Sequence, residues 1–181
     1  MLKPVDVTED APWKRRFRAW TVLTAAVASR EPSRGMATTN RTGVHQIYAW
    51  DVASGELRQL TFRAAGKVAA WLSPDGRFVY YLDDEQGNEI GHVVRVRYEG
   101  GEAEDVTPDL PPYALASLAL SRDGQHIAIT AATREGFRTY MSDLGAGGAI
   151  GPWREIYHTS ALMRGVHVSN EAAIAVLGLT E

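Results

Sequence analysis

The sequence predicts an all-β chain made of repeated four-stranded antiparallel units, arranged as the blades of a β-propeller. Two recurring patterns support this prediction. A Ser-x-Asp-Gly hairpin at Ser73–Gly76 returns 48 positions later at Ser121–Gly124. Between the hairpins, an alternating apolar–polar segment leads through a glycine turn to another short strand. A repeat of about 45 residues with four strands is typical of a propeller blade.

The hairpins define the first two strands of each unit. Asp-Gly between two apolar runs is a strong hairpin signal, because glycine supplies the positive φ that a tight turn needs. A degenerate third copy follows at Ser169-Asn170-Glu171. The apolar runs joined in this way are 68–72 with 78–82, 114–120 with 126–130, and 163–168 with 172–177.

The second pattern supplies the third and fourth strands. Its three copies run from 46–51 through Gly55 to 60–61, from 93–98 through Gly100 to 106–107, and, more weakly, from 138–143 through 145–148 to 156–157. Each copy alternates apolar and polar residues before its turn, as expected for a strand with one face toward a core. Each unit therefore holds four short strands.

The two patterns divide the chain into a leader, 1–15, and a partial propeller domain, 16–181. We expect blades at about 16–62, 67–108 and 114–158, and a half blade at 161–181, which makes about three and a half blades. An incomplete ring exposes strand edges that favour pairing with another chain. A second copy of the chain is therefore one expected partner, because two copies would complete a ring of seven.

The apolar run from Ala19 to Ala28 has two interpretations. It follows the basic cluster 14–18 and ends in Ala-Val-Ala, as a secretory signal with a small-residue cleavage site would. The acidic leader and the Thr, Val and Trp content favour a buried strand instead. We adopt the strand and expect a cytoplasmic protein, bacterial or archaeal because the composition is rich in Arg and Ala; a secreted or periplasmic protein is the alternative.

Composition and motifs argue against several functions. A net charge of −3 provides no basic surface for nucleic acid, and no apolar run approaches the about 18 residues of a membrane helix. Cysteine is absent. No Gly-x-Ser-x-Gly elbow is present, and Ser73 and Ser121 lie at turns, where serine is expected for backbone hydrogen bonding. The five histidines show no metal-ligand spacing. We therefore expect no catalytic residue, no metal site and no cofactor.

Charged residues in the loops between second and third strands are the candidate binding residues. In an up-and-down blade these loops all emerge on one face, and loops on a rigid scaffold are where binding usually resides. The candidates are Arg41, Asp83, Asp84, Glu85, Glu89 and Arg134. Contact with a peptide terminus or with a hydrolase domain is one interpretation. A set of solvated turns is the other.

Several segments of the second unit resemble the propeller of prolyl oligopeptidase-family serine peptidases, including acylaminoacyl-peptidase-like members. They are Trp71–Arg77, Tyr80–Leu82, Asp84–Glu89 and Gly91–Val96. The Ser-Pro-Asp-Gly hairpin alone is shared with TolB-like and WD-repeat propellers, whereas the Asp-Glu-Gln-Gly-Asn-Glu stretch is more specific.

The resemblance implies a propeller that precedes an α/β-hydrolase domain and gates the access of peptides to it. This chain contains no such second domain. We therefore expect a non-catalytic propeller segment that gates peptide access or docks to a hydrolase domain, and that is not an enzyme by itself. The alternative is a stand-alone TolB-like or WD-repeat-like propeller module that binds a protein partner.

Overall fold

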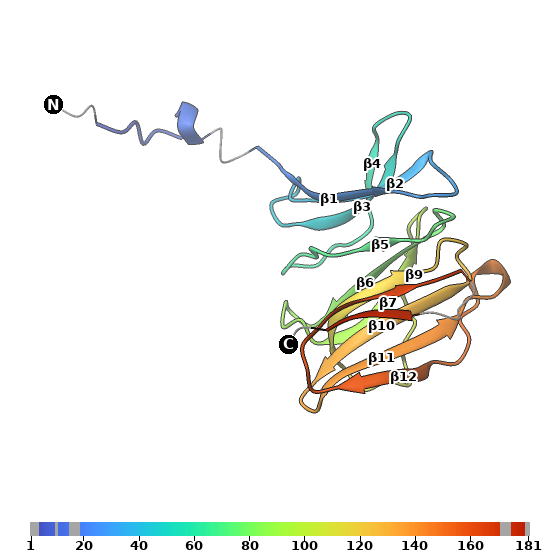
Figure 1. Cartoon of the computed structure of the whole chain (residues 1–181). Coiled ribbons are helices and arrows are strands. Elements are labelled where there is room, and N and C mark those ends of the chain that lie inside the picture. Colours follow the sequence, from blue (N-terminus) through green and yellow to red (C-terminus); the bar gives the residue numbers. More distant parts are fainter. Residues whose placement is uncertain (1–3, 10, 15–18, 171–174, 180–181) are drawn as a thin grey trace.

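The chain folds into three four-stranded antiparallel sheets and one two-stranded sheet, which follow one another along the sequence (Figure 1). The computed structural model describes residues 4–9, 11–14, 19–170 and 175–179. In each sheet the strands are ordered as they occur in the chain. This arrangement confirms the predicted all-β fold of four-stranded propeller blades.

The first sheet contains β1 (Val22–Val27), β2 (Arg34–Thr39), β3 (Gln46–Asp51) and β4 (Leu57–Gln59). The second contains β5 (Trp71–Leu72), β6 (Phe78–Asp84), β7 (Gly91–Arg97) and β8 (Glu104–Asp105). The third contains β9 (Ala114–Leu120), β10 (His126–Thr133), β11 (Gly136–Asp143) and β12 (Arg154–Thr159). The two-stranded sheet pairs β13 (Met163–Val168) with β14 (Ala175–Leu179). A short 3-10 turn, η1 (Ala146–Gly148), connects β11 to β12.

The hairpin between β5 and β6 is closed by its own side chains. The hydroxyl of Ser73 donates to Asp75 (2.6 Å) and accepts from the backbone N–H of Phe78 (3.0 Å). Gly76 takes the left-handed conformation, with φ of 68°. Ser73 therefore satisfies backbone groups of the turn, as the sequence predicted.

The hairpin between β9 and β10 repeats this arrangement atom for atom. Ser121 donates to Asp123 (2.6 Å) and accepts from the N–H of His126 (2.9 Å), while Gly124 has φ of 72°. The degenerate third copy at 169–171 extends into residues 171–174, which lie outside the described residues.

Adjacent sheets pack face to face because side chains alternate along each strand. On β6, Val79 and Tyr81 face the first sheet, where they join Met36 and Ile47 in one buried cluster. Phe78 and Tyr80 face the opposite way, into a cluster with Leu118, Ile127 and Ile129 of the third sheet. A smaller cluster of Ala128, Met141 and Val166 joins the third sheet to β13. The second sheet is thus covered on both faces.

The first strand differs from expectation in its environment. β1 is a strand, as predicted, but most of it is exposed, with Leu23 53% and Val27 45% accessible. The prediction of a buried strand was wrong, because no sheet of the described chain packs on its outer face. The basic residues 15–18 lie outside the described residues.

Within the described ranges, no helix combines the length and the apolar character that crossing a membrane would require.

Candidate functional site

Several loops meet at one end of the sheets, which we call the loop face. It comprises the β2–β3 loop (40–45), the β4–β5 connection (60–70), the β6–β7 loop (85–90) and the β8–β9 connection (106–113). Backbone hydrogen bonds hold these segments together: Lys67 N–H donates to His45 (2.7 Å), and Gly91 exchanges two bonds of 3.0 Å with Tyr113. The loop face is therefore a continuous surface across the first and second sheets and the start of the third.

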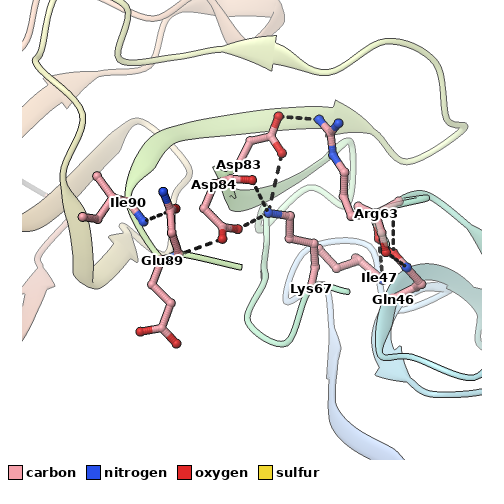
Figure 2. A network of polar contacts seen from close by, with 10 residues as sticks. Gln46, Ile47, Arg63, Lys67, Asp83, Asp84, Glu89 and Ile90 are labelled. Carbon is pink, nitrogen blue, oxygen red and sulfur yellow. Dashed lines mark hydrogen bonds and ion pairs between the residues drawn. The ribbon is translucent and has the colours of Figure 1, made fainter. Parts of the chain in front are cut away.

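Gln46 fixes the β4–β5 connection from inside the first sheet. Its amide donates to the carbonyl of Arg63 (2.6 Å), and its side-chain oxygen accepts from the Thr61 hydroxyl (2.7 Å) (Figure 2). Gln46 is 3% exposed. Because buried polar groups are stable only when their hydrogen bonds are satisfied, this arrangement holds Arg63 at the foot of the loop face.

A buried ion pair lies where the β4–β5 connection crosses the end of β6. The ammonium of Lys67 contacts Asp84, and it lies 3.6 Å from the carboxylate of Asp83 (Figure 2). The side chains of Lys67 and Asp84 are 6% and 9% exposed. Arg63 forms the second ion pair of the cluster, 2.5 Å from Asp83. Two cations thus balance two carboxylates.

The hydrogen bonds of Asp84 determine its ionisation. Burial alone would raise the pKa of Asp84, but the hydrogen bonds from Lys67 and from the Glu89 backbone N–H (3.1 Å) outweigh it, and the pKa lies below its usual value. Asp84 is therefore ionised at neutral pH. One of its oxygens faces Lys67 and the other holds the β6–β7 loop.

The β6–β7 loop has an unusual backbone. Gln86 and Glu89 have φ of 54° and 61°, and they are the only non-glycine residues with positive φ in the described chain. Such a conformation costs a non-glycine residue about 1 kcal/mol. The bond to Asp84 and a bond from Ile90 N–H to the Asn88 side chain (3.0 Å) maintain it.

A pocket of about 360 Å³ opens on the loop face beside this loop. Its apolar wall comes from two sheets, with Trp71 and Leu82 from the second and Leu115 from the third. Val68, which is 55% exposed, lies on its wall, and Glu89 is also among its lining residues. Apolar walls with a few polar groups are typical of ligand pockets.

A second, shallower hollow lies on the other side of the β6–β7 loop. Asp83, Glu85, His92 and Asp105 are among its lining residues. Nδ1 of His92 lies 2.6 Å from Asp105, and the His92 ring stacks on that of Tyr113. Within the described ranges, no three His, Cys, Asp or Glu side chains are grouped so that they could hold a metal ion.

The structure brings together four of the six candidate residues. Asp83, Asp84, Glu85 and Glu89 lie together at the end of β6 and in the loop that follows. Arg41 and Arg134 lie in the corresponding turns of the first and third sheets, both exposed. Within the described residues, neither arginine side chain bonds to the acidic group.

Sequence reasoning did not select Arg63, Lys67 or Trp71 for the site. The partner of Lys67, Asp84, is 17 residues away and belongs to a different element. The one signal in the sequence was the glycine before Lys67. In the structure Gly66 has φ of 79°, and a Cβ there would lie 2.6 Å from the carbonyl of His45. A glycine that is needed for close backbone contact marks a built loop.

Comparison with known proteins supports the fold but shows no family. No protein-family model matches the chain, and no curated protein matches it. Solved structures do match. A TolB-like protein from Agrobacterium tumefaciens aligns with a TM-score of 0.62 at 17% identity, over 89% of this chain and 59% of that protein.

Two further matches have a similar extent. A chain of the nidogen/laminin complex aligns with a TM-score of 0.61 at 11% identity, over 86% of this chain and 56% of that one. A prolyl endopeptidase aligns with a TM-score of 0.59 at 18% identity, over 89% of this chain and 25% of that enzyme. The chain thus spans little more than half of the TolB-like protein and a quarter of the peptidase. These likenesses show that the chain has a propeller fold similar to the propellers of both TolB-like proteins and prolyl endopeptidases.

Proposed function

We propose that this chain is a propeller module that binds a peptide segment of a protein partner on its loop face. The observation that carries the proposal is the pocket between the second and third sheets, whose rim is a β6–β7 loop held in a strained conformation by the buried Lys67–Asp84 pair. Backbone strain that is maintained by a dedicated ion pair is characteristic of functional loops. The role is recognition, performed by side chains on a rigid scaffold.

Peptide selection followed by hydrogen exchange tests this function. The full chain is used to select binders from a library of displayed random peptides, and amide exchange is then measured with and without the selected peptides. We expect protection in the β4–β5, β6–β7 and β8–β9 segments of the loop face. Protection confined to the β5–β6 and β9–β10 hairpins, at the opposite end of the sheets, or failure to select any peptide would refute it.

A second candidate is the propeller of a prolyl oligopeptidase-like peptidase, in which the module would gate peptide access or dock to a hydrolase domain. The resemblance of Asp84–Glu89 and Trp71–Arg77 to that family, together with the alignment to a prolyl endopeptidase, favours it. Sequencing the coding region that flanks these residues tests it. An in-frame hydrolase domain with a Gly-x-Ser-x-Gly elbow supports the gating role. The absence of such a domain excludes this second candidate.

A further inference from the structure

The pocket on the loop face combines an apolar interior with an unbalanced negative rim. Trp71, Leu82 and Leu115 line its interior, and its volume of about 360 Å³ is at the lower end of ligand pockets. An interior of this size suits one large apolar side chain better than a whole cofactor. The apolar wall therefore supplies the part of a recognition site that contacts an apolar side chain.

The charged residues around the pocket supply its electrostatic part. Lys67 and Arg63 are already paired with Asp84 and Asp83. Glu89, which lines the pocket, is exposed and forms no ion pair with any residue that the structure describes. Figure 2 shows the carboxylate of Glu89 pointing away from Lys67. The rim therefore presents negative charge that no cation of the described chain neutralises.

The position of Glu89 is set by its backbone. Its positive φ of 61° would cost nothing to a glycine, so the glutamate side chain is present in spite of the strain. The N–H of Glu89 is fixed on Asp84, and Asp84 is fixed on Lys67. Asp84 and Lys67 act as positioning residues, and Glu89 is the group left to meet a ligand.

We propose that this pocket takes an apolar side chain of a peptide whose neighbouring Arg or Lys pairs with Glu89. The proposal rests on the proposed function and adds the chemistry of its ligand. Charge complementarity decides the occupant, because an acidic rim repels an acidic peptide. A fully polar peptide also binds poorly, because its polar groups find no hydrogen-bond partners on the apolar wall. The ligand is thus a basic–apolar sequence motif within a partner protein.

Capped heptapeptides test this specificity, since capping leaves only side-chain charge. The reference peptide has a central Leu-Arg pair in a Gly/Ser context. Three others carry Leu-citrulline, Ala-Arg, or the same residues with Arg moved three positions from Leu. Affinity is measured by calorimetry on the full chain. We expect citrulline to weaken binding about three- to fivefold, as for an exposed ion pair, and Ala to weaken it about tenfold.

Variants of the protein complete the test. Glu89→Gln should weaken the reference peptide by the same factor as citrulline and make the two peptides equal in affinity. Glu89→Lys should instead prefer a Leu-Glu peptide. The control is Glu56→Gln, an exposed glutamate in the β3–β4 turn at the opposite end of the sheet, which should change nothing. Thermal melting verifies that each variant is folded.

The outcomes separate this inference from the function on which it rests. Equal binding of the Arg and citrulline peptides, or an effect of Glu56→Gln as large as that of Glu89→Gln, overturns the motif. If selected peptides still protect the loop face in that case, the proposed binding function stands without the basic–apolar motif. If no peptide protects the loop face, both fail.

Discussion

The guanidinium of Arg95 lies over the ring of Phe78, with its Cζ 4.4 Å from the ring centroid. Arg95 projects from β7 and is 8% exposed, and it also pairs with Glu104 at 2.8 Å. Its Nη1 donates to the carbonyl of Gly148, in the connection between β11 and β12 of the third sheet. One buried side chain thus joins two neighbouring sheets.

Replacing Arg95 by Met should lower the free energy of unfolding by about 2 kcal/mol. The change keeps an apolar side chain but leaves the Gly148 carbonyl without its donor. Chemical denaturation measures the loss. Arg97→Met is the matched control: Arg97 lies on the same strand and also approaches Phe78 (5.7 Å), but it is exposed, so its loss should stay within about 0.5 kcal/mol. Equal losses for the two variants would contradict a bridging role for Arg95.

Replacing Lys67 by Met should destabilise the fold by about 3 kcal/mol at neutral pH, because it leaves the buried Asp84 carboxylate unpaired. The loss should shrink as the pH falls and Asp84 becomes protonated. In the unchanged protein, by contrast, the stability that Asp84 contributes decreases as the pH falls. The pKa of Asp84 is lowered by folding, so its stabilisation is present above the unfolded pKa and is lost as pH falls through the folded one.

The double variant Lys67→Met, Asp84→Asn separates the pair from general damage. Removing both charges should recover part of the stability lost in Lys67→Met alone. Denaturation at several pH values, from about pH 3 to about pH 8, gives the comparison. Additive losses at every pH would show that the two side chains are not coupled.

Replacing Gly66 by Ala should cost clearly more than replacing Gly55 by Ala. The two glycines have similar φ, 79° and 76°, so the backbone strain of about 1 kcal/mol is common to both. A Cβ at Gly66 would lie 2.6 Å from the carbonyl of His45, whereas at Gly55 it would meet nothing within 4 Å. Melting temperatures of the two variants, measured side by side, isolate the steric contribution. A smaller loss at Gly66 would mean that the loops can separate freely.

Tyr113 should ionise well above the usual range of tyrosine. Burial raises the pKa of Tyr113 to about 12, although Thr107 and the N–H of Val93 lie within hydrogen-bonding distance of its hydroxyl. Since folding raises this pKa, the corresponding stability is present below about pH 10 and is lost as the pH rises toward 12. Ultraviolet difference titration, compared between the unchanged chain and Tyr113→Phe, reveals the late-titrating group. A step missing near pH 10 in the variant would contradict the assignment.

The features that sequence reasoning anticipated are those that depend on nearby residues. The hairpin at Ser73 closes through Asp75, Gly76 and Phe78, all within five positions, so the sequence pattern contains every group that the turn needs. The apolar run at 78–82 likewise predicted a strand directly after this turn, and the structure has β6 there. Both were predicted because the physics is local.

The features that it missed depend on how sheets meet. Lys67 was not selected because its partner is brought near only when the β4–β5 connection crosses β6. The pocket needs Leu115 from the third sheet beside Trp71 from the second. β1 was expected to be buried because its residues are apolar, but burial also requires a neighbouring sheet. None of these conditions is visible in a window of sequence.

The repeated turn at Ser73 and Ser121 also bears on how the chain reaches its native state. Each turn completes its bonds within a span of six residues, so its closure sacrifices little chain entropy and does not wait for distant segments. Each hairpin can therefore nucleate independently and recruit the next strand outward, and the polypeptide can be organised unit by unit as it leaves the ribosome.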